Sequence, residues 1–270
     1  ACHQVQDVSL FGKQARIQCI DRFQGTRIQV LHETGIRVEQ PVFPLIHPRH
    51  SLLIVTETGI QAILDRRSES RVTQEIVERT GPLPPARVIY VLAQACAALE
   101  EAHSIGLVHR DVKESNLILC RRGLDLDVLK VMDFGLVKDV TTATEHTVAD
   151  AIPGTPPYIA PERLSDPLNI DSRSDLYSLG AVAFNLLTGK PLFEGGSAMD
   201  IAYQVVANPA PRISTFVEVA PELDQLVSDC LERNPDARPP SAQAICERLQ
   251  AIIRKPWSQA DAHNWWAQHP

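Results

Sequence analysis

The residues best suited to chemistry lie in two short motifs, HRDVKESN at positions 109–116 and DFG at positions 133–135. The first motif places the carboxylate of Asp111, the ammonium of Lys113 and the carboxamide of Asn116 within six residues, and the second adds another carboxylate beside a glycine. A carboxylate that orients a hydroxyl group, with an amide and a second carboxylate that hold Mg²⁺, is what phosphoryl transfer requires. Because proteins assist this chemistry mainly by positioning groups and neutralising charge, fixed polar side chains on short loops suit it.

The hydrophobic pattern predicts the elements that would hold these motifs in place. Pro84 and Pro85 suit the start of a helix, which then carries one apolar stripe. The stripe consists of Val88, Val91, Leu92, Ala95, Leu99 and Ala102. Short strands are predicted at 117–119, directly after the first motif, and at 128–132, directly before the second. Further helices are predicted at 74–79, 171–189, 223–231 and 242–253.

The order and spacing of these motifs resemble those of the eukaryotic-type Ser/Thr protein kinase family, in a bacterial-like form. The first motif resembles the catalytic loop, the second the metal-binding triplet, and APE at positions 160–162 the end of the activation segment. The resemblance covers roughly residues 75–255. It implies an α+β fold with two lobes, of which the amino-terminal lobe is small and β-rich and the carboxy-terminal lobe is mainly α-helical. It also implies transfer of the γ-phosphate of ATP to Ser/Thr of protein substrates, with Mg²⁺ as cofactor.

The resemblance assigns catalytic roles to four residues. Asp111 would orient the substrate hydroxyl and accept its proton, and Lys113 would neutralise charge on the transferred phosphate. Asn116 and Asp133 would hold Mg²⁺, a hard ion that prefers oxygen ligands. Glu114 departs from the family, in which proline is usual, and is expected to add a negative charge beside the loop.

Nucleotide binding and regulation are assigned in the same way. Ile118 and Met132 match positions that line the adenine pocket, although ordinary core packing would explain both equally well. Arg110 would bind a phosphate on the activation segment, where the possible phosphorylation sites are Thr141, Thr142, Thr144 and Thr147. Thr155 resembles the threonine that contacts the catalytic aspartate and lysine.

Five residues match structural anchors of the family. Glu162 and Arg238 resemble a buried ion pair that ties the activation segment to the lower lobe. Asp175 resembles the aspartate that holds the backbone of the catalytic loop, and His109 and Phe134 match positions that pack the active centre.

The first 75 residues lack the motifs that the resemblance implies. No Gly-rich phosphate-binding loop occurs, because the glycines there stand alone. Lys13 is the only lysine before Lys113 and hence the only possible ATP-binding lysine, but no VAIK-like strand surrounds it. Strands are predicted at 5–10, 27–30 and 51–56. A diverged, a truncated and a frame-shifted amino-terminal lobe would each explain this pattern.

Composition excludes several kinds of protein. The chain has 26 basic and 33 acidic residues, and the net charge of −7 argues against binding to nucleic acid. It contains no apolar run of about 18 residues, so no membrane segment is expected, and no signal peptide is visible. Six cysteines without metal-ligand spacing predict free thiols and a cytoplasmic location.

The motifs divide the chain into a degenerate or partial amino-terminal lobe at 1–80, a helical lobe at 81–255 and a Trp-rich helix at 256–270. Trp257, Trp265 and Trp266 all lie in this last part, and Ser258 with Asp261 three residues later resembles a capped helix start. We expect this helix to pack on the helical lobe. Docking of a partner is the alternative, because aromatic residues are enriched at interfaces.

Two functions therefore remain open from the sequence. The complete set of catalytic residues in the helical lobe favours an active Ser/Thr kinase. The poorly recognisable amino-terminal lobe favours a pseudokinase or truncated scaffold that binds partners without phosphate transfer. Because no recognisable motif binds the phosphates, we expect this 270-residue chain to bind Mg·ATP weakly and to transfer phosphate slowly or not at all.

Overall fold

The computed structural model contains two compact units, residues 1–57 and 58–270. The structure describes residues 5–10, 13–20, 27–31, 37–38, 53–56, 59–62, 70–134, 156–165 and 170–269, and up to residue 62 it describes secondary structure alone.

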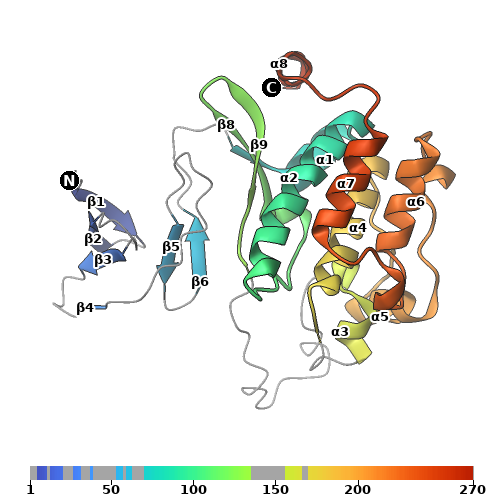
Figure 1. Ribbon diagram of the computed structural model, residues 1–270, viewed down its shortest axis with the longest axis horizontal. Helices are drawn as coiled ribbons and strands as arrows, with labels where there is room; N and C mark the ends of the chain where they lie inside the picture. The colour runs from blue at the N-terminus through green and yellow to red at the C-terminus, as the bar shows by residue number, and fades with distance from the viewer. Residues whose placement is uncertain are drawn as a thin grey trace. The chain divides into compact units, whose positions relative to one another are not determined.

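The first unit contains a four-stranded antiparallel sheet (Figure 1). Its strands are β1 (Val5–Leu10), β2 (Lys13–Ile20), β3 (Arg27–Leu31) and β4 (Arg37–Val38), paired in that order, and β5 (Leu53–Thr56) follows. The strands predicted at 5–10, 27–30 and 51–56 correspond to β1, β3 and β5. Strand β2 was not predicted, although the alternation of Ala15, Ile17 and Cys19 is typical of a strand.

The second unit has a small sheet beside its helices. Strand β6 (Gly59–Ala62) comes first, and β7 (Ser70–Val72), β8 (Leu117–Arg122) and β9 (Asp125–Val131) form a three-stranded antiparallel sheet in the order β7-β8-β9. The β8–β9 hairpin corresponds to the two strands predicted around the motifs. It is longer than predicted, because the turn occupies only the two residues between Arg122 and Asp125, where Gly123 has a φ of 63°.

The helices make up most of the second unit (Figure 1). They are α1 (Thr73–Thr80), α2 (Pro85–Ser104), α3 (Pro161–Ser165), α4 (Arg173–Thr188), α5 (Ala198–Ala207), α6 (Pro221–Cys230), α7 (Ala242–Ile252) and α8 (Gln259–Gln268). Helix α2 packs against β9, α4 and α7, and α4 also packs against α6. All six residues of the apolar stripe predicted on α2 are buried. Helices α3 and α5 were not predicted, although Ser197, whose side chain accepts the N–H of Asp200, marks the start of α5.

The core of the second unit surrounds α4, which is buried along nearly its whole length. Gly180 lies where α4 meets α6. A Cβ at this position would lie 2.8 Å from the Cβ of Cys230 and 3.2 Å from the side chain of Leu231. The close approach of the two helices therefore requires glycine.

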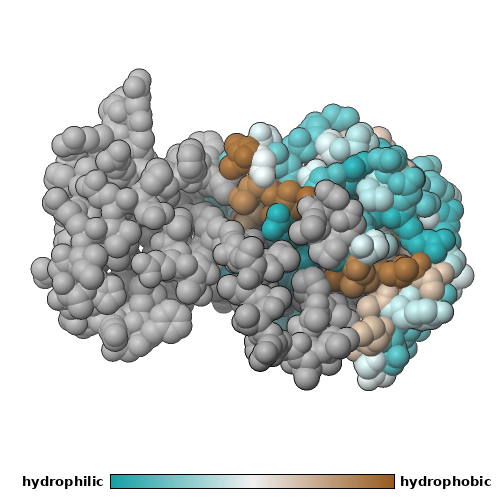
Figure 2. Space-filling view, turned by 90° about the horizontal axis from the view of Figure 1, so that it is seen from below, coloured by the Kyte–Doolittle hydropathy of each residue, from teal (hydrophilic) through white to brown (hydrophobic). Residues whose placement is uncertain are grey.

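Figure 2 shows one face, on which the coloured residues are hydrophilic over much of the area and form a few apolar patches. Among the described residues, no helix has the length and apolar character needed to cross a bilayer. The four described cysteines are free thiols, as predicted: Cys96, Cys120, Cys230 and Cys246.

Candidate active site

The HRDVKESN motif connects α2 to β8 and is anchored to the first turn of α4 through Asp175. The backbone N–H of His109 donates to Oδ2 of Asp175 at 2.7 Å, and the N–H of Arg110 donates to Oδ1 at 2.8 Å. His103, on the last turn of α2, places its Nε2 2.9 Å from the same Oδ2. Asp175 is 1% exposed, so this carboxylate holds the loop backbone from inside the core. Arg110 has a φ of 65°, an uncommon conformation that these bonds stabilise.

Two reactive side chains of the motif, Lys113 and Asn116, both contact Asp111. Nζ of Lys113 lies 2.7 Å from Oδ2 of Asp111. Nδ2 of Asn116 donates to the backbone carbonyl of Asp111 at 2.8 Å and to its Oδ2 at 3.2 Å. Asp111 is only partly buried. The carboxylate is therefore held on one oxygen while its side chain remains accessible from solvent.

His109 joins the motif to the DFG segment. Its ring accepts the N–H of Asp111 at Nδ1, 3.3 Å away, and its Nε2 lies 2.9 Å from the carbonyl of Met132. These two partners require the neutral tautomer with the proton on Nε2. The pKa of His109 is lowered, mainly because the ring is buried. The ring also packs against Phe134, with 4.5 Å between ring centroids.

The two possible metal ligands approach each other through the backbone. The N–H of Met132 donates to the carbonyl of Asn116 at 2.8 Å. Asp133 is the next residue, so this bond brings it near the end of the catalytic loop. Asp133 is exposed and has a φ of 51°. Because the Asn116 amide directs its N–H groups to Asp111, its oxygen remains as the ligand atom. An amide oxygen and a carboxylate suit Mg²⁺, which prefers oxygen donors.

Glu162 and Arg238 form an ion pair below the loop. Nη1 and Nη2 of Arg238 each lie 2.7 Å from one carboxylate oxygen of Glu162. Burial raises the pKa of Glu162, but the hydrogen bonds and charge of Arg238 outweigh that effect, and the net shift is downward. On the adjacent turn, the guanidinium of Arg163 donates to the carbonyl of Arg110, so α3 also contacts the catalytic loop.

Glu114 behaves differently from the surface charge expected beside the loop. This residue is 1% exposed, and its side chain bonds to the hydroxyl of Tyr158, which lies just before the APE motif that ends the activation segment. Burial raises the pKa of Glu114 to about 7, although the bond to Tyr158 opposes the shift. Among the described residues, its Oε1 has no hydrogen-bond partner.

The remaining site residues are only partly covered by the structure. Ile118 is buried in β8, and Met132 is half-buried at the end of β9. Lys13 lies in β2 opposite Leu10, but its side chain is outside the described residues. The possible contact and phosphorylation sites of the activation segment also lie outside them: Thr141, Thr142, Thr144, Thr147 and Thr155.

Several contacting residues have no sequence signal that would have identified them. His103 and Arg163 meet the catalytic loop only because α2 and α3 bring them there. Arg87 and Asp127 form a buried ion pair that joins α2 to β9, 40 residues apart in the chain.

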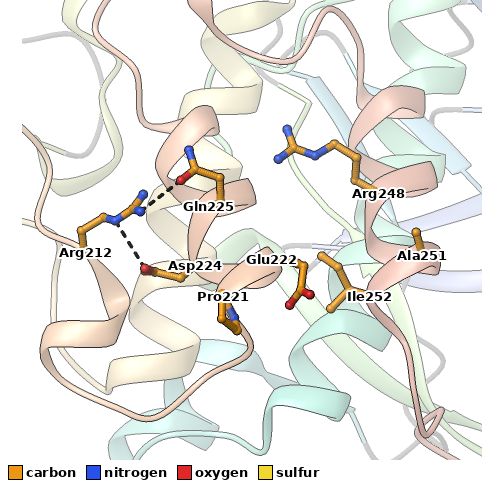
Figure 3. Close-up of a pocket in the computed structure, with 8 residues that line it drawn as sticks. All are labelled: Arg212, Pro221, Glu222, Asp224, Gln225, Arg248, Ala251 and Ile252. Atoms are coloured by element: carbon orange, nitrogen blue, oxygen red, sulfur yellow. Dashed lines mark hydrogen bonds and ion pairs between the residues drawn. The ribbon is translucent and has the colours of Figure 1, made fainter.

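A separate hollow of about 620 Å³ lies beside α6 and α7 (Figure 3). Its cations already have partners: Arg212 contacts Asp224 at 3.3 Å and Gln225 at 3.0 Å, and Arg248 contacts Asp229 at 2.7 Å. No residue of the catalytic loop lines this hollow. The candidate active site is therefore the catalytic loop and not the hollow.

Comparisons with known proteins agree with this geometry. Residues 49–251 match the family model described as protein kinase domain. The chain is 40% identical over 189 residues to Serine/threonine-protein kinase PknB of Mycolicibacterium smegmatis, covering 69% of this chain and 29% of the relative. It is 42% identical over 188 residues to PknL of Mycobacterium tuberculosis, covering 69% of this chain and 46% of the relative. The chain therefore spans less than half the length of these curated relatives. A solved structure of the Rad53 kinase domain and SCD2 has a TM-score of 0.59 at 20% identity, with 90% of each chain covered, which shows the fold.

Proposed function

Because this chain belongs to the protein kinase family, we propose that it transfers the γ-phosphate of ATP to serine and threonine residues of protein substrates. The observation that carries the proposal is the contact of Lys113 and Asn116 with one oxygen of Asp111, on a backbone that Asp175 anchors. Positioned charges of this kind supply much of the rate in phosphoryl transfer.

Each reactive side chain has one role in this proposal. Oδ2 of Asp111 contacts Lys113 and Asn116, which leaves Oδ1 to accept the hydrogen bond, and then the proton, of the substrate hydroxyl. The hydroxyl oxygen bonds to the γ-phosphorus as the bond to the bridging oxygen of ADP breaks, and Lys113 offsets charge on the phosphoryl oxygens. Asn116 and Asp133 would hold Mg²⁺, which when bound neutralises charge on the nucleotide phosphates.

Regulation and nucleotide contacts complete the proposal. Arg110 is exposed beside Asp111, where it could bind a phosphate on the activation segment, with Thr147 among the possible acceptors and Thr155 near the catalytic residues. Ile118 and Met132 would contact adenine, and Lys13 is the only lysine available for the phosphates in the amino-terminal part. The free cysteines suit a reducing cytoplasm.

The test is transfer of radiolabelled γ-phosphate to a generic protein substrate. Asp111→Asn should lower the rate by about 10²–10⁴-fold, because the hydroxyl loses its proton acceptor. Asp171→Asn is the matched control. This exposed aspartate pairs with Arg173 away from the catalytic loop, and its loss should leave the rate unchanged. Equal rates for the wild-type chain and Asp111→Asn would contradict the proposal.

A binding protein without phosphate transfer is the second candidate. The observation that favours it is that the family match begins only at residue 49, and no phosphate-binding loop occurs in the sequence. ATP binding that requires Mg²⁺ and is lost in Asp133→Ala, without transfer, would indicate a crippled kinase. Absence of any nucleotide binding would favour a scaffold. Docking through the Trp-rich helix has less support, because the indole N–H groups of Trp257 and Trp266 already bond within the chain.

A further inference from the structure

The β8–β9 hairpin carries a buried ion pair at the end opposite to the DFG segment. Asp127, in β9, accepts bonds from Nε of Arg87 at 2.8 Å and from Nη2 of Arg87 at 2.7 Å. Both side chains are completely buried. Hydrogen bonds to the remaining groups of a buried ion pair offset part of the cost of removing its charges from water.

Two tryptophans provide such hydrogen bonds to the carboxylate, and the third contacts the guanidinium through its ring. The indole N–H of Trp257 donates to Oδ2 of Asp127 at 3.0 Å, and that of Trp266 donates to Oδ1 at 2.8 Å. Each carboxylate oxygen therefore has two donors. The ring of Trp265 lies 3.8 Å from Cζ of Arg87, a distance suited to a cation–π contact. The carboxy-terminal segment thus completes the contacts of the carboxylate, whereas Nη1 of Arg87 has no hydrogen-bond partner among the described residues.

Helix α8 also binds the backbone of the hairpin (Figure 1). The side-chain amide of Gln259 accepts the N–H of Leu126 at 2.7 Å and donates to its carbonyl at 3.1 Å, as a neighbouring strand would. From the other side, Gln94 of α2 donates to the carbonyl of Asp127 at 2.9 Å and accepts the N–H of Leu129 at 3.0 Å. The start of β9 is therefore held between α2 and α8.

The backbone of Asp127 needs this support. Its φ is 56°, which is uncommon for a residue other than glycine, and such conformations persist only where surrounding contacts impose them. The hairpin pairing also shifts register between Cys120 and Arg122, close to this point. Release of the Asp127 side chain would let the backbone relax and would change how β9 pairs with β8.

Strand β9 connects this point to the candidate active site. It ends at Val131, and the next residue, Met132, donates its N–H to the carbonyl of Asn116. We propose that α8 and the three tryptophans act as a clamp that sets the register of the β8–β9 hairpin and so positions Asp133 and Asn116. The clamp is argued from the contacts above, whereas its effect on the binding of Mg·nucleotide rests on the proposed function.

The test uses a variant in which a phenyl ring replaces the indole ring at two tryptophan positions. The double variant Trp257→Phe/Trp266→Phe removes both indole N–H donors to Asp127 and leaves apolar contact area. Leu226→Ala is the control for general destabilisation, because Leu226 is buried in α6 away from the hairpin. The temperature is adjusted so that both proteins lie equally far below their melting midpoints.

Hydrogen exchange of the free, full-length chain gives the first readout. In the double variant the amides of Leu126, Leu129 and Met132 should all exchange faster than in the control, by about tenfold or more, because the hairpin opens locally. Faster exchange at Leu126 and Leu129 with no change at Met132 would show that the clamp is local and would overturn the positioning role. No difference from the control at any of the three would overturn the clamp.

Nucleotide binding gives the second readout. The dissociation constant for ATP with Mg²⁺ should rise about fivefold or more in the double variant, and the constant without Mg²⁺ should stay unchanged, since the proposed effect is on the metal ligands. An equal rise with and without Mg²⁺ would overturn the role in metal positioning. If the wild-type chain binds no nucleotide, the proposed function fails, and hydrogen exchange still decides the clamp.

Discussion

Arg238 directs all five of its N–H groups to partners, and two of them meet the carboxylate of Glu162 side by side at 2.7 Å. The others donate to the backbone carbonyls of Glu232, Arg173 and Arg233. The Arg238 side chain is fully buried and that of Glu162 is 15% exposed. One guanidinium therefore connects the end of the activation segment with the start of α4 and the loop that follows α6.

Arg238→Ala should lower the free energy of unfolding by about 3–5 kcal/mol, because it leaves the Glu162 carboxylate partly buried without its cation. Glu162→Ala should add little to that loss in the same background, since the interaction is already gone. Urea denaturation of the two single variants and the double variant measures the coupling. Asp236→Ala is the control, because its pair with Arg173 is exposed and should contribute about 1 kcal/mol or less. Additive effects of the Glu162 and Arg238 changes would contradict a direct contact.

Asp175→Asn should weaken the anchoring of the catalytic-loop backbone. The asparagine keeps the volume of the side chain but replaces one acceptor oxygen with an NH₂ group, so one of the buried N–H groups of His109 and Arg110 loses its partner, at a cost of about 1–3 kcal/mol. Amide exchange at these two residues should rise together with a loss of thermal stability. His103→Ala removes only the third contact to Asp175 and should have a smaller effect on the two amides. Unchanged amide protection in Asp175→Asn would show that the loop does not depend on this carboxylate.

Glu114 should make stability fall as the pH rises from about 4 to 7. Burial raises its pKa to about 7 in the folded chain, whereas an unfolded glutamate ionises near about 4.3. Below the lower value both states are protonated and nothing is lost. Between the two values only the unfolded state releases its proton, so stability decreases until the folded state also ionises.

Glu114→Gln removes this dependence, because glutamine does not ionise. The variant should match the wild-type chain near pH 4.5 and exceed it near pH 8 by about 3–4 kcal/mol. Denaturation midpoints across this range provide the measurement. Glu75→Gln changes an exposed glutamate on α1 and should leave the pH profile as it is. A stability gain for Glu114→Gln that is constant with pH would contradict the raised pKa.

Gly180→Ala should destabilise the core by about 1–3 kcal/mol, because the added methyl group meets the Cβ of Cys230 and the two helices must separate. Replacement of Asn185, which is only half-buried on the same helix, by alanine should be tolerated. Thermal melts of the two variants distinguish the steric effect from helix propensity, which favours alanine in both. A Gly180→Ala chain as stable as the wild type would show that α4 and α6 can separate without cost.

The sequence by itself determined the local features. Asp111, Lys113 and Asn116 lie within six residues, so their spacing alone predicted that they could act together. Helices α2, α6 and α7 were predicted because each carries enough apolar residues to show a helical period. Helix α4 was predicted from its long apolar run and its match to the central buried helix of the family, and the start of α8 from the capping box of Ser258 and Asp261. The short helix α3 has too few residues for such a period.

Only the tertiary structure decided the long-range contacts. Asp127 meets Arg87 across 40 residues, Trp257 across 130 and Trp266 across 139, and no local pattern marks an aspartate in a hairpin as the partner of a distant helix. The sequence predicts that Glu114 is a charge beside a polar loop, but packing around Tyr158 buries its side chain and raises its pKa. Burial and partner choice depend on which elements the fold brings together, and the chain specifies that through the packing of its whole core rather than through the residues beside each site.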